Sequence, residues 1–385
     1  MKIAIKELGA IITGNTPSKK VKEYWDSKDI CFVKPDIIAD EGVGDIIQSN
    51  EYISESARKK ARIVKENAIF VTCIGSIGKI GVAGSGEYAF NQQINVIIPN
   101  EKVRPKYLAY NLYFNKAKLV VIANAPVVPI INKSQFGDFI INIDTDINKQ
   151  KKVIEVLDKL TKNIQQRKNE IIYLDNLIKA RFVEMFGDPV INPKGWEVVT
   201  IGDIVTEVKY GTSKPAVEGG RYPYLRMNNL TVDGHLNLDD LKYIDIPDDE
   251  IEKCVVRKGD VLFNRTNSIE LVGKTVVFDL PEEMVIAGYI IRIRLNEKIL
   301  PEVLSQYMNL EALKDILRSM AKGAVNQANI NAQELQSIKV YLPDMELQKQ
   351  FIEIRKQVNK SKVKVQKALD ETKKLFDSLM QQYFG

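Results

Sequence analysis

The stretch INKQKKVIEVLDKLTKNIQQRKNEIIYLDNLIKARFVEMFG (Ile147–Gly187) has no glycine or proline before its last residue. Its apolar residues recur at alternating spacings of four and three, a heptad pattern that predicts a coiled-coil helix. At 1.5 Å per residue, a helix of this length measures about 60 Å. The alternative is a single long helix on a globular core. We favour the coiled coil, because nothing else in the chain is shaped to cover so long an apolar stripe.

A second stretch repeats this helix later in the chain. ELQKQFIEIR matches NKQKKVIEVL at an offset of 198 residues, so that a glutamine recurs at Gln150 and Gln348. Both helical stretches end in Phe-Gly. Further matches upstream of the helices have offsets that drift by several residues. A repeat of this length indicates a duplicated pair of domains and not a solenoid.

The two helices are expected to lie antiparallel and to pair through the apolar positions of their heptads. The residues expected to pair are Val153, Leu157, Leu160, Ile164, Ile171, Leu174, Ile178, Phe351, Val358, Val365, Leu369, Phe376 and Leu379. Polar side chains interrupt the stripe at Arg167, Arg181, Arg355, Lys362 and Thr372.

The segments before each long helix have a mixed, β-rich character. AIFVTCIG, GKIGVAG and INVIIP in the first copy, and DVLFNRT, GKTVVFDL and YIIRIRL in the second, are short strand-like runs punctuated by glycine. One helical piece follows in each copy, at residues 106–123 and 302–321. The linker DPVINPKG carries two prolines and a glycine, which stop the first helix. The predicted fold is therefore α+β, with two mixed, β-rich domains at residues 1–145 and 188–342 and long helices at 146–187 and 343–385.

Composition limits the class of protein. The 385 residues are 45% hydrophobic, enough for roughly two to four domains with proper cores. No run of 18 apolar residues occurs, and no long apolar core follows the first lysines, so neither a membrane span nor a signal peptide is expected. The three cysteines, Cys31, Cys73 and Cys254, are widely spaced. They argue against a disulfide framework and a zinc ribbon, and suit a reducing cytoplasm.

The charge is unevenly distributed along the chain. The net charge is +5, made up of +4 in residues 1–145, +3 in 146–187, −5 in 188–342 and +3 in 343–385. A strongly basic chain would indicate nucleic acid as a partner. The acidic balance of residues 188–342 means that DNA binding there would need local basic clusters.

Catalytic motifs are not found in the sequence. The sequence contains a single histidine, which excludes metal sites of several histidines. This residue, His235, stands in an Asp/Gly-rich loop and is expected to be solvated. Gly273-Lys274-Thr275 looks like the tail of a phosphate loop, but Ser268 stands where the earlier glycine is required. Cys73 has no partner histidine, and its simplest role is that of a strand cysteine. Duplication without catalytic residues favours a binding protein.

Each mixed domain offers polar loops at matched positions. In the first copy these are TGNTPSKK, VKPDI, CIGSIGK and FNQQIN, and in the second KYGTSK, LRMNN, FNRTNSIELVGK and AGYI. Arg, Lys, Asn and Gln recognise base edges through bidentate hydrogen bonds, while Ser, Thr and backbone N–H groups hold phosphates. On composition alone, ordinary surface loops are the stronger interpretation.

The arrangement of the loops favours DNA contacts over ordinary surface loops. Their order across both copies, each closed by a long helix ending in Phe-Gly, resembles the specificity subunits of type I restriction–modification enzymes. The resemblance covers the whole chain, and it rests on the order of the motifs and not on any single one. It implies a target-recognition domain in each copy that recognises one half of a split, asymmetric DNA site. The paired helices would act as a spacer and as a dock for two methyltransferase subunits.

The resemblance also implies where the chemistry lies. Methyl transfer, ATP-driven translocation and cleavage would belong to partner subunits, together with S-adenosylmethionine, ATP and Mg²⁺. This chain would be a non-catalytic cytoplasmic protein without cofactor or metal. Its partners would be double-stranded DNA and two methyltransferase subunits, with restriction or translocase subunits as further candidates.

The same resemblance assigns the matched loops as base or phosphate contacts. The residues so implied are Thr16, Ser18, Lys19, Lys34, Asp36, Ser76, Lys79, Gln92, Gln93, Tyr210, Thr212, Ser213, Lys214, Arg226, Asn228, Asn229, Asn264, Arg265, Thr266, Asn267 and Lys274. Which of them touches which base does not carry over from the family.

A second function remains open: a non-catalytic coiled-coil scaffold whose mixed domains bind protein. A scaffold duplicated for symmetry would keep both copies alike, whereas a protein that recognises two different half-sites would not. The helices match at a constant offset and the loops diverge, which favours DNA recognition.

Overall fold

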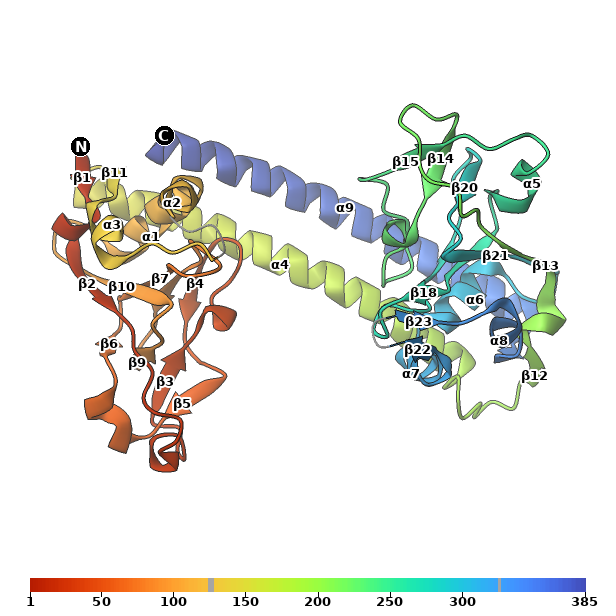
Figure 1. Ribbon diagram of the computed structural model, residues 1–385, viewed down its shortest axis with the longest axis horizontal. Helices are drawn as coiled ribbons and strands as arrows, with labels where there is room; N and C mark the ends of the chain where they lie inside the picture. Colours follow the sequence, from red (N-terminus) through yellow and green to blue (C-terminus); the bar gives the residue numbers. More distant parts are fainter. Residues whose placement is uncertain (124–127, 325–326) are drawn as a thin grey trace. The chain divides into compact units, whose positions relative to one another are not determined.

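The computed structural model describes residues 1–123, 128–324 and 327–385 (Figure 1). The chain divides into two compact units. Unit 1 consists of Met1–Lys168 and Gln366–Gly385, and unit 2 consists of Asn169–Val365. Each unit therefore contains one mixed domain and a segment of each long helix.

Unit 1 is built on two mixed sheets. The first has the strand order β2 (Gly9–Thr13), β10 (Ile94–Pro99), β7 (Ile69–Thr72), β8 (Ile80–Ala83) and β4 (Val43–Ile46). The second has the order β5 (Glu51–Ile53), β3 (Ile30–Val33), β9 (Glu87–Phe90) and β6 (Ile63–Lys65). A separate antiparallel pair joins β1 (Lys2–Ala4) to β11 (Ile140–Asn142).

Unit 2 repeats this topology. One sheet has the order β13 (Val205–Tyr210), β21 (Ile290–Leu295), β17 (Val261–Asn264) and β19 (Thr275–Val277), and the other β15 (Lys242–Ile244), β14 (Tyr222–Leu225), β20 (Met284–Ile286) and β16 (Val255–Val256). The strand pair β12 (Glu197–Thr200) and β24 (Lys339–Leu342) corresponds to β1 and β11. A small sheet consists of β18 (Thr266–Asn267), β23 (Gln327–Asn329) and β22 (Lys322–Ala324). In the described part of unit 1 it corresponds to a single antiparallel bridge between Ile74 and Ile130. The duplicated α+β fold predicted from the sequence is confirmed.

The helical piece expected after the strands is present in each unit, where it is divided into two helices. Unit 1 has α1 (Pro105–Phe114) and α2 (Lys116–Ile122), and unit 2 has α6 (Pro301–Met308) and α7 (Glu311–Met320). The Asn115 amide donates to Asn111 O at 2.9 Å, and the Asn309 amide donates to Ser305 O at 3.0 Å. Asn111 O also accepts from Asn115 N at 3.1 Å, and Ser305 O from Asn309 N at 3.2 Å, so each asparagine bonds the last helical turn through both its backbone and its side chain. The short helices are α3 (Lys133–Asp138), α5 (Ile251–Cys254) and α8 (Ala332–Gln336).

The long helices have the predicted lengths, α4 (Ile147–Phe186) and α9 (Met345–Phe384). Within unit 1 the first half of α4 lies with the last part of α9, and within unit 2 the end of α4 lies with the start of α9, so the two are antiparallel (Figure 1). The residues expected to pair the helices are all buried or half-buried. A direct link is the Arg167 guanidinium, which donates to the carbonyl of Ala368.

The helix ends are also built into the domain cores. Phe384 is buried in unit 1 against Tyr107, with ring centroids 5.1 Å apart. Phe186 is buried in unit 2 against Phe182 and Phe351, at 4.7 and 5.5 Å. The Phe of each Phe-Gly pair is therefore a core residue of a recognition unit. The heptad stripe covers a domain as well as the opposite helix.

A buried glutamine fixes the start of each long helix. The Gln150 amide donates to Asp144 O at 2.7 Å and accepts from Arg104 N at 2.8 Å. The Gln348 amide makes the equivalent bonds, donating to Pro343 O at 2.9 Å and accepting from Leu300 N at 2.9 Å. Both side chains are fully buried. The Gln match in the sequence thus reflects a repeated clamp between the helix and the loop before α1 or α6.

A glycine sits at the same close approach in both units. A Cβ atom on Gly14 would lie 2.0 Å from Asn91 O, and one on Gly211 would lie 2.2 Å from Ile286 O. The Gly14 N–H donates to Ile94 O at 3.0 Å, and the Gly211 N–H to Ile290 O at 3.1 Å. Only a residue without a side chain fits where the chain crosses so near another backbone. In the part of the chain that the structure describes, no helix is long and apolar enough to cross a membrane.

Candidate nucleic-acid interface

The predicted loops of the two units are held by equivalent backbone hydrogen bonds, which we call the framework. In unit 1 the Cys73 N–H donates to Gln93 O at 2.8 Å, and in unit 2 the Arg265 N–H donates to Tyr289 O at 3.0 Å. Thus Cys73 and Arg265 occupy equivalent positions, as do Gln93 and Tyr289. The hairpin that follows is three residues longer in unit 2, which accounts for part of the drift of the repeat offset.

Different side chains stand on this shared framework. Residues 91–93 are Asn-Gln-Gln in unit 1, and the equivalent residues 287–289 are Ala-Gly-Tyr in unit 2. Gln92 is exposed and its Oε1 accepts a hydrogen bond from Thr16 at 2.8 Å. Gln93 is half-buried and pairs with the Asn91 amide at 2.8 Å. Unit 1 therefore presents carboxamides where unit 2 presents a tyrosine.

Unit 2 presents an arginine stacked on an aromatic ring. The Arg265 guanidinium lies over the Tyr210 ring, 4.9 Å from its centroid, an arrangement that favours a cation. Tyr210 and Tyr289 are 43% and 49% exposed. The Arg265 Nε atom is buried and has no hydrogen-bond partner among the described residues, while Nη1 reaches Gly288 O at 3.4 Å. The residue as a whole is half-buried, so the guanidinium keeps partial access to a ligand although its Nε atom does not.

A second pair of equivalent positions carries a basic side chain in each unit. Lys34 and Arg226 precede matching 3₁₀ turns, and their side chains are about one-third exposed. Lys34 pairs with Glu51, and Lys19 joins the same carboxylate at 3.2 Å. These ammonium groups, Lys34 first, hold the pKa of Glu51 below its usual value. The Arg226 guanidinium pairs with Asp240 at 2.7 Å and lowers the pKa of that carboxyl.

Lys79 and Lys274 turn out to make the same internal contact. Lys79 Nζ donates to Pro35 O at 3.3 Å, and Lys274 Nζ donates to Met227 O at 2.6 Å. Lys274 is 6% exposed, and burial lowers its pKa. Both lysines therefore pin the 3₁₀ turn to the hairpin. Their repetition in the sequence reflects this structural bond, and we expect their DNA contacts to be minor.

Three further predicted contacts are buried in unit 2. The Asn264 amide is fully buried, donating to Thr266 O and Tyr289 O at 3.1 Å each and accepting from Asn267 at 2.8 Å. Thr266 and Asn229 are 6% and 2% exposed. Side chains without access to solvent cannot reach a base edge in this conformation. We therefore reinterpret these residues as shaping the loop.

The remaining predicted residues lie at or near the surface. Thr16, Ser18, Lys19, Asp36, Ser76, Ser213 and Asn228 are exposed, and Thr212, Lys214 and Asn267 are half-buried. Asp36 accepts from Asn50 at 3.4 Å, and Lys214 pairs with Glu250 at 2.9 Å. The hydroxyl, amide and ammonium groups of this set are of the types that bind phosphates, and that role stays a prediction. The Asp36 carboxylate is an acceptor and suits a base amino group instead.

Two aromatic features of these loops were not predicted from the sequence. Tyr210 was among the predicted contacts, whereas its exposed neighbour in the framework, Tyr289, was not. In unit 1, Lys19 lies over Trp25 at 5.1 Å and Lys28 over Tyr52 at 5.7 Å, around a hollow of about 460 Å³. The interleaving of Trp, Tyr and Lys at residues 19–52 was the pattern that could have shown it.

Comparison with known proteins identifies the family. The model of the type I restriction modification DNA specificity domain matches residues 1–173 and 193–372. The chain belongs to this family. Each match covers one of the two copies found in the sequence and in the structure.

The relatives of this specificity-domain chain include archaeal and bacterial proteins. The MjaIX specificity subunit of a type I restriction enzyme of Methanocaldococcus jannaschii is 29% identical over 59% of this chain and 57% of the relative. The EcoKI specificity subunit of Escherichia coli is 23% identical over 80% of this chain and 73% of the relative. A match to the MjaX specificity subunit of M. jannaschii spans only 39% of that protein, at 33% identity and over 42% of this chain. The chain thus spans about half the length of the first two archaeal relatives.

Solved structures support the specificity-subunit fold. The S subunit of a type I restriction–modification system from M. genitalium has a TM-score of 0.59 and 15% identity, and covers all of this chain and 96% of its own. A chain from a study of assembly and conformational transition of the type I system has a TM-score of 0.57 and 18% identity, with 100% and 97% covered. At these identities the likeness shows the fold alone.

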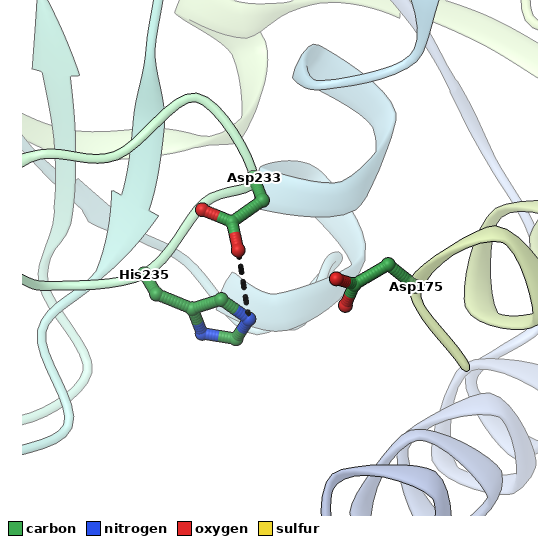
Figure 2. Close-up of side chains that lie close together, drawn as sticks. All are labelled: Asp175, Asp233 and His235. Carbon is green, nitrogen blue, oxygen red and sulfur yellow. Dashed lines mark ion pairs between the residues drawn. The ribbon is translucent and has the colours of Figure 1, made fainter. Parts of the chain in front are cut away.

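One cluster of potential metal ligands lies away from the recognition loops of the specificity-domain fold. Ligand atoms of Asp175, Asp233 and His235 all lie within 4.8 Å of one another (Figure 2). The Lys362 ammonium already stands among them, 2.7 Å from Asp175 and 3.5 Å from Asp233. His235 lies in a loop, as expected, with its side chain 38% exposed, and partial burial lowers its pKa.

Proposed function

We propose that this chain recognises a split, asymmetric DNA site as the specificity subunit of a type I restriction–modification complex. Each unit binds one half of the site through the loops at the ends of its sheets. The long helices hold the halves at a spacing and offer the docking surface for two methyltransferase subunits. Family membership supports this role.

The contrast between framework and loops carries the proposal. The hydrogen bonds of Cys73 and Arg265, and those of Gly14 and Gly211, are the same in both units. The exposed residues on this framework differ, with Gln92 in one unit and Tyr289 in the other. A scaffold would have no reason to keep the backbone and change the ligand-facing chemistry. A protein that recognises two unlike half-sites needs that combination.

The side chains suggest which bases each unit prefers. A carboxamide such as that of Gln92 can bind adenine N6 and N7 in the major groove, and a guanidinium such as that of Arg265 can bind guanine O6 and N7. The Tyr210 ring holds the Arg265 group in place, which reduces the rotational freedom that binding would remove. We therefore expect adenine recognition in the half-site of unit 1 and guanine recognition in that of unit 2.

Methyl transfer, translocation and cleavage are assigned to partner subunits. S-adenosylmethionine, ATP and Mg²⁺ would bind there, and the complex would act in the cytoplasm. The direct test uses radiolabelled S-adenosylmethionine and a DNA library of random sequence. The chain alone should bind DNA without transferring a methyl group, and methylation should begin when the modification subunits are added. Methyl transfer by the purified chain alone would contradict the proposal.

A further inference from the structure

In each unit a loop follows the 3₁₀ turn that comes after β3 or β14. In unit 1 this loop carries Glu41, whose Oε2 lies 3.0 Å from Lys168 Nζ on α4. In unit 2 it carries Asp233, whose Oδ2 lies 3.5 Å from Lys362 Nζ on α9. The two loops differ in sequence and length, yet each sends a carboxylate to a lysine of the long helices.

The surroundings of Glu41 and Asp233 lower the pKa of both carboxylates. The Lys168 ammonium, through its hydrogen bond, lowers the pKa of Glu41, with a smaller effect from Lys373. Burial alone would raise the pKa of Asp233, but the Thr231 hydroxyl, His235 and Lys362 together lower it. Both groups are therefore held in the charged form that an ion pair requires.

The unit 2 loop is held in a defined conformation by hydrogen bonds and by close packing. The Thr231 hydroxyl donates to His235 O at 2.8 Å and accepts from His235 N at 2.9 Å. Gly234 adopts a φ of +82° and lies so close to α6 that a Cβ atom would be 2.8 Å from the Asn309 amide. Asp233 thus reaches the helices from a fixed support.

The helix side of the contact links both long helices. Lys362 on α9 is shared between Asp233 and Asp175, the latter on α4 at 2.7 Å (Figure 2 shows the two carboxylates around His235). The Lys362 and Asp175 side chains are only 19% and 25% exposed, so solvent screens this pair less than a surface pair. The loop of unit 2 is therefore fastened to the helix pair and not to one helix.

We propose that these ion pairs are positioning contacts that fix each recognition domain on the helix pair. Glu41–Lys168 acts in unit 1, and Asp233–Lys362–Asp175 acts in unit 2. On the proposed function, on which this inference rests, they determine the spacing of the half-sites that the protein accepts. They take no part in recognising the bases themselves.

The test compares Lys362→Met with Lys356→Met. Lys356 lies on the same helix and pairs at 2.7 Å with Glu353 of that helix, so it is a matched control. Binding is measured on DNAs with the preferred half-sites and spacers of varied length. Lys362→Met should reduce the discrimination between the preferred spacer and its neighbours by about two- to fivefold, the range for a partly shielded ion pair. Base preference within each half-site and the behaviour of Lys356→Met should stay unchanged.

Hydrogen exchange of the Thr231–His235 amides gives a readout independent of DNA. It should be faster in Lys362→Met and unchanged in β17 and β21. Unchanged exchange and unchanged spacer discrimination would overturn the proposal, as would faster exchange with no change in spacer discrimination. A wild-type chain that binds DNA without sequence preference would contradict the proposed function. In that case hydrogen exchange would still test whether Lys362 holds the loop on the helices.

A divalent metal is the alternative occupant of the Asp175–Asp233–His235 cluster. The ion-pair assignment predicts that Zn²⁺ or Mn²⁺ leaves exchange of the loop unchanged, because the Lys362 ammonium holds the position between the carboxylates. Slower exchange of wild-type Thr231–His235 on adding Zn²⁺ at micromolar concentration, reversed by a chelator, would overturn the ion-pair assignment in favour of a metal centre.

Discussion

The hairpins β7–β8 and β17–β19 have the same backbone bonds and different surfaces. In both, the framework is closed by a lysine that donates to a backbone carbonyl, Lys79 to Pro35 and Lys274 to Met227. Above it, unit 1 carries carboxamides, and unit 2 carries Arg265 with Tyr210 and Tyr289. The difference teaches that a repeated polar residue in this fold marks the framework, whereas a changed one marks the ligand-facing surface.

The largest effect is expected where the framework is repeated most closely. Gln150→Leu or Gln348→Leu would leave buried N–H and C=O groups without partners, at a cost of about 2–4 kcal/mol. Each substitution should destabilise its own unit by a similar amount. Hydrogen exchange, read separately in β7 and in β17, measures this. Destabilisation by one substitution and not by the other would show that the two clamps are not equivalent.

A smaller loss is expected at a residue that shapes one loop. Asn264→Ala removes a fully buried amide with bonds to Thr266 and Tyr289, and should lower the free energy of unfolding of unit 2 by about 1–3 kcal/mol. Because the Asn264 amide faces the protein, binding should weaken at every position of that half-site and not at one base. Urea titration and binding to a half-site library give the two readouts. Loss of preference at a single base pair, with an unchanged free energy of unfolding, would show that Asn264 contacts a base directly.

A pH effect is expected from unit 2, where burial lowers the pKa of Lys314 to about 7. The pKa of an unfolded lysine is about 10.4. Between these values the unfolded state binds more protons, so the stability of unit 2 should rise with pH, by at most about 1.4 kcal/mol per pH unit. Lys314→Met should remove this slope and increase stability at pH 7. Urea titrations at pH 7, 8 and 9 test the slope, and an unchanged slope in the variant would contradict the assignment.

The sequence predicted the parts of the molecule that repeat with a period. The bounds of α4 follow from an uninterrupted heptad, and the Gln150–Gln348 match marks a true structural equivalence. The division of the helical piece at Asn115 was not predicted, because it depends on one amide bonding to a carbonyl of the turn before it.

The site was predicted less completely than the fold. Lys79, Lys274 and Asn264 are of the residue types that bind DNA, but the sequence does not say whether a donor is already used within the protein. Tyr289 was missed because its place is defined by a backbone bond from Arg265, a residue distant in sequence. Burial and hydrogen-bond partners, which only the structure supplies, separate the framework from the ligand-facing surface.

The most direct measurement of the central claim is selection of bound DNA from a library of random split sites. Wild-type protein is compared with Gln92→Ala and Arg265→Ala, with Lys356→Met, an exposed substitution on α9 in unit 2, as the control. Each of the two test variants should lose preference at positions in one half-site only, by about 1–3 kcal/mol per lost base contact, and the two halves should differ. Lys356→Met should keep the base preferences of the wild type. Equal loss in both halves from either test variant would contradict an account in which each unit recognises its own half-site.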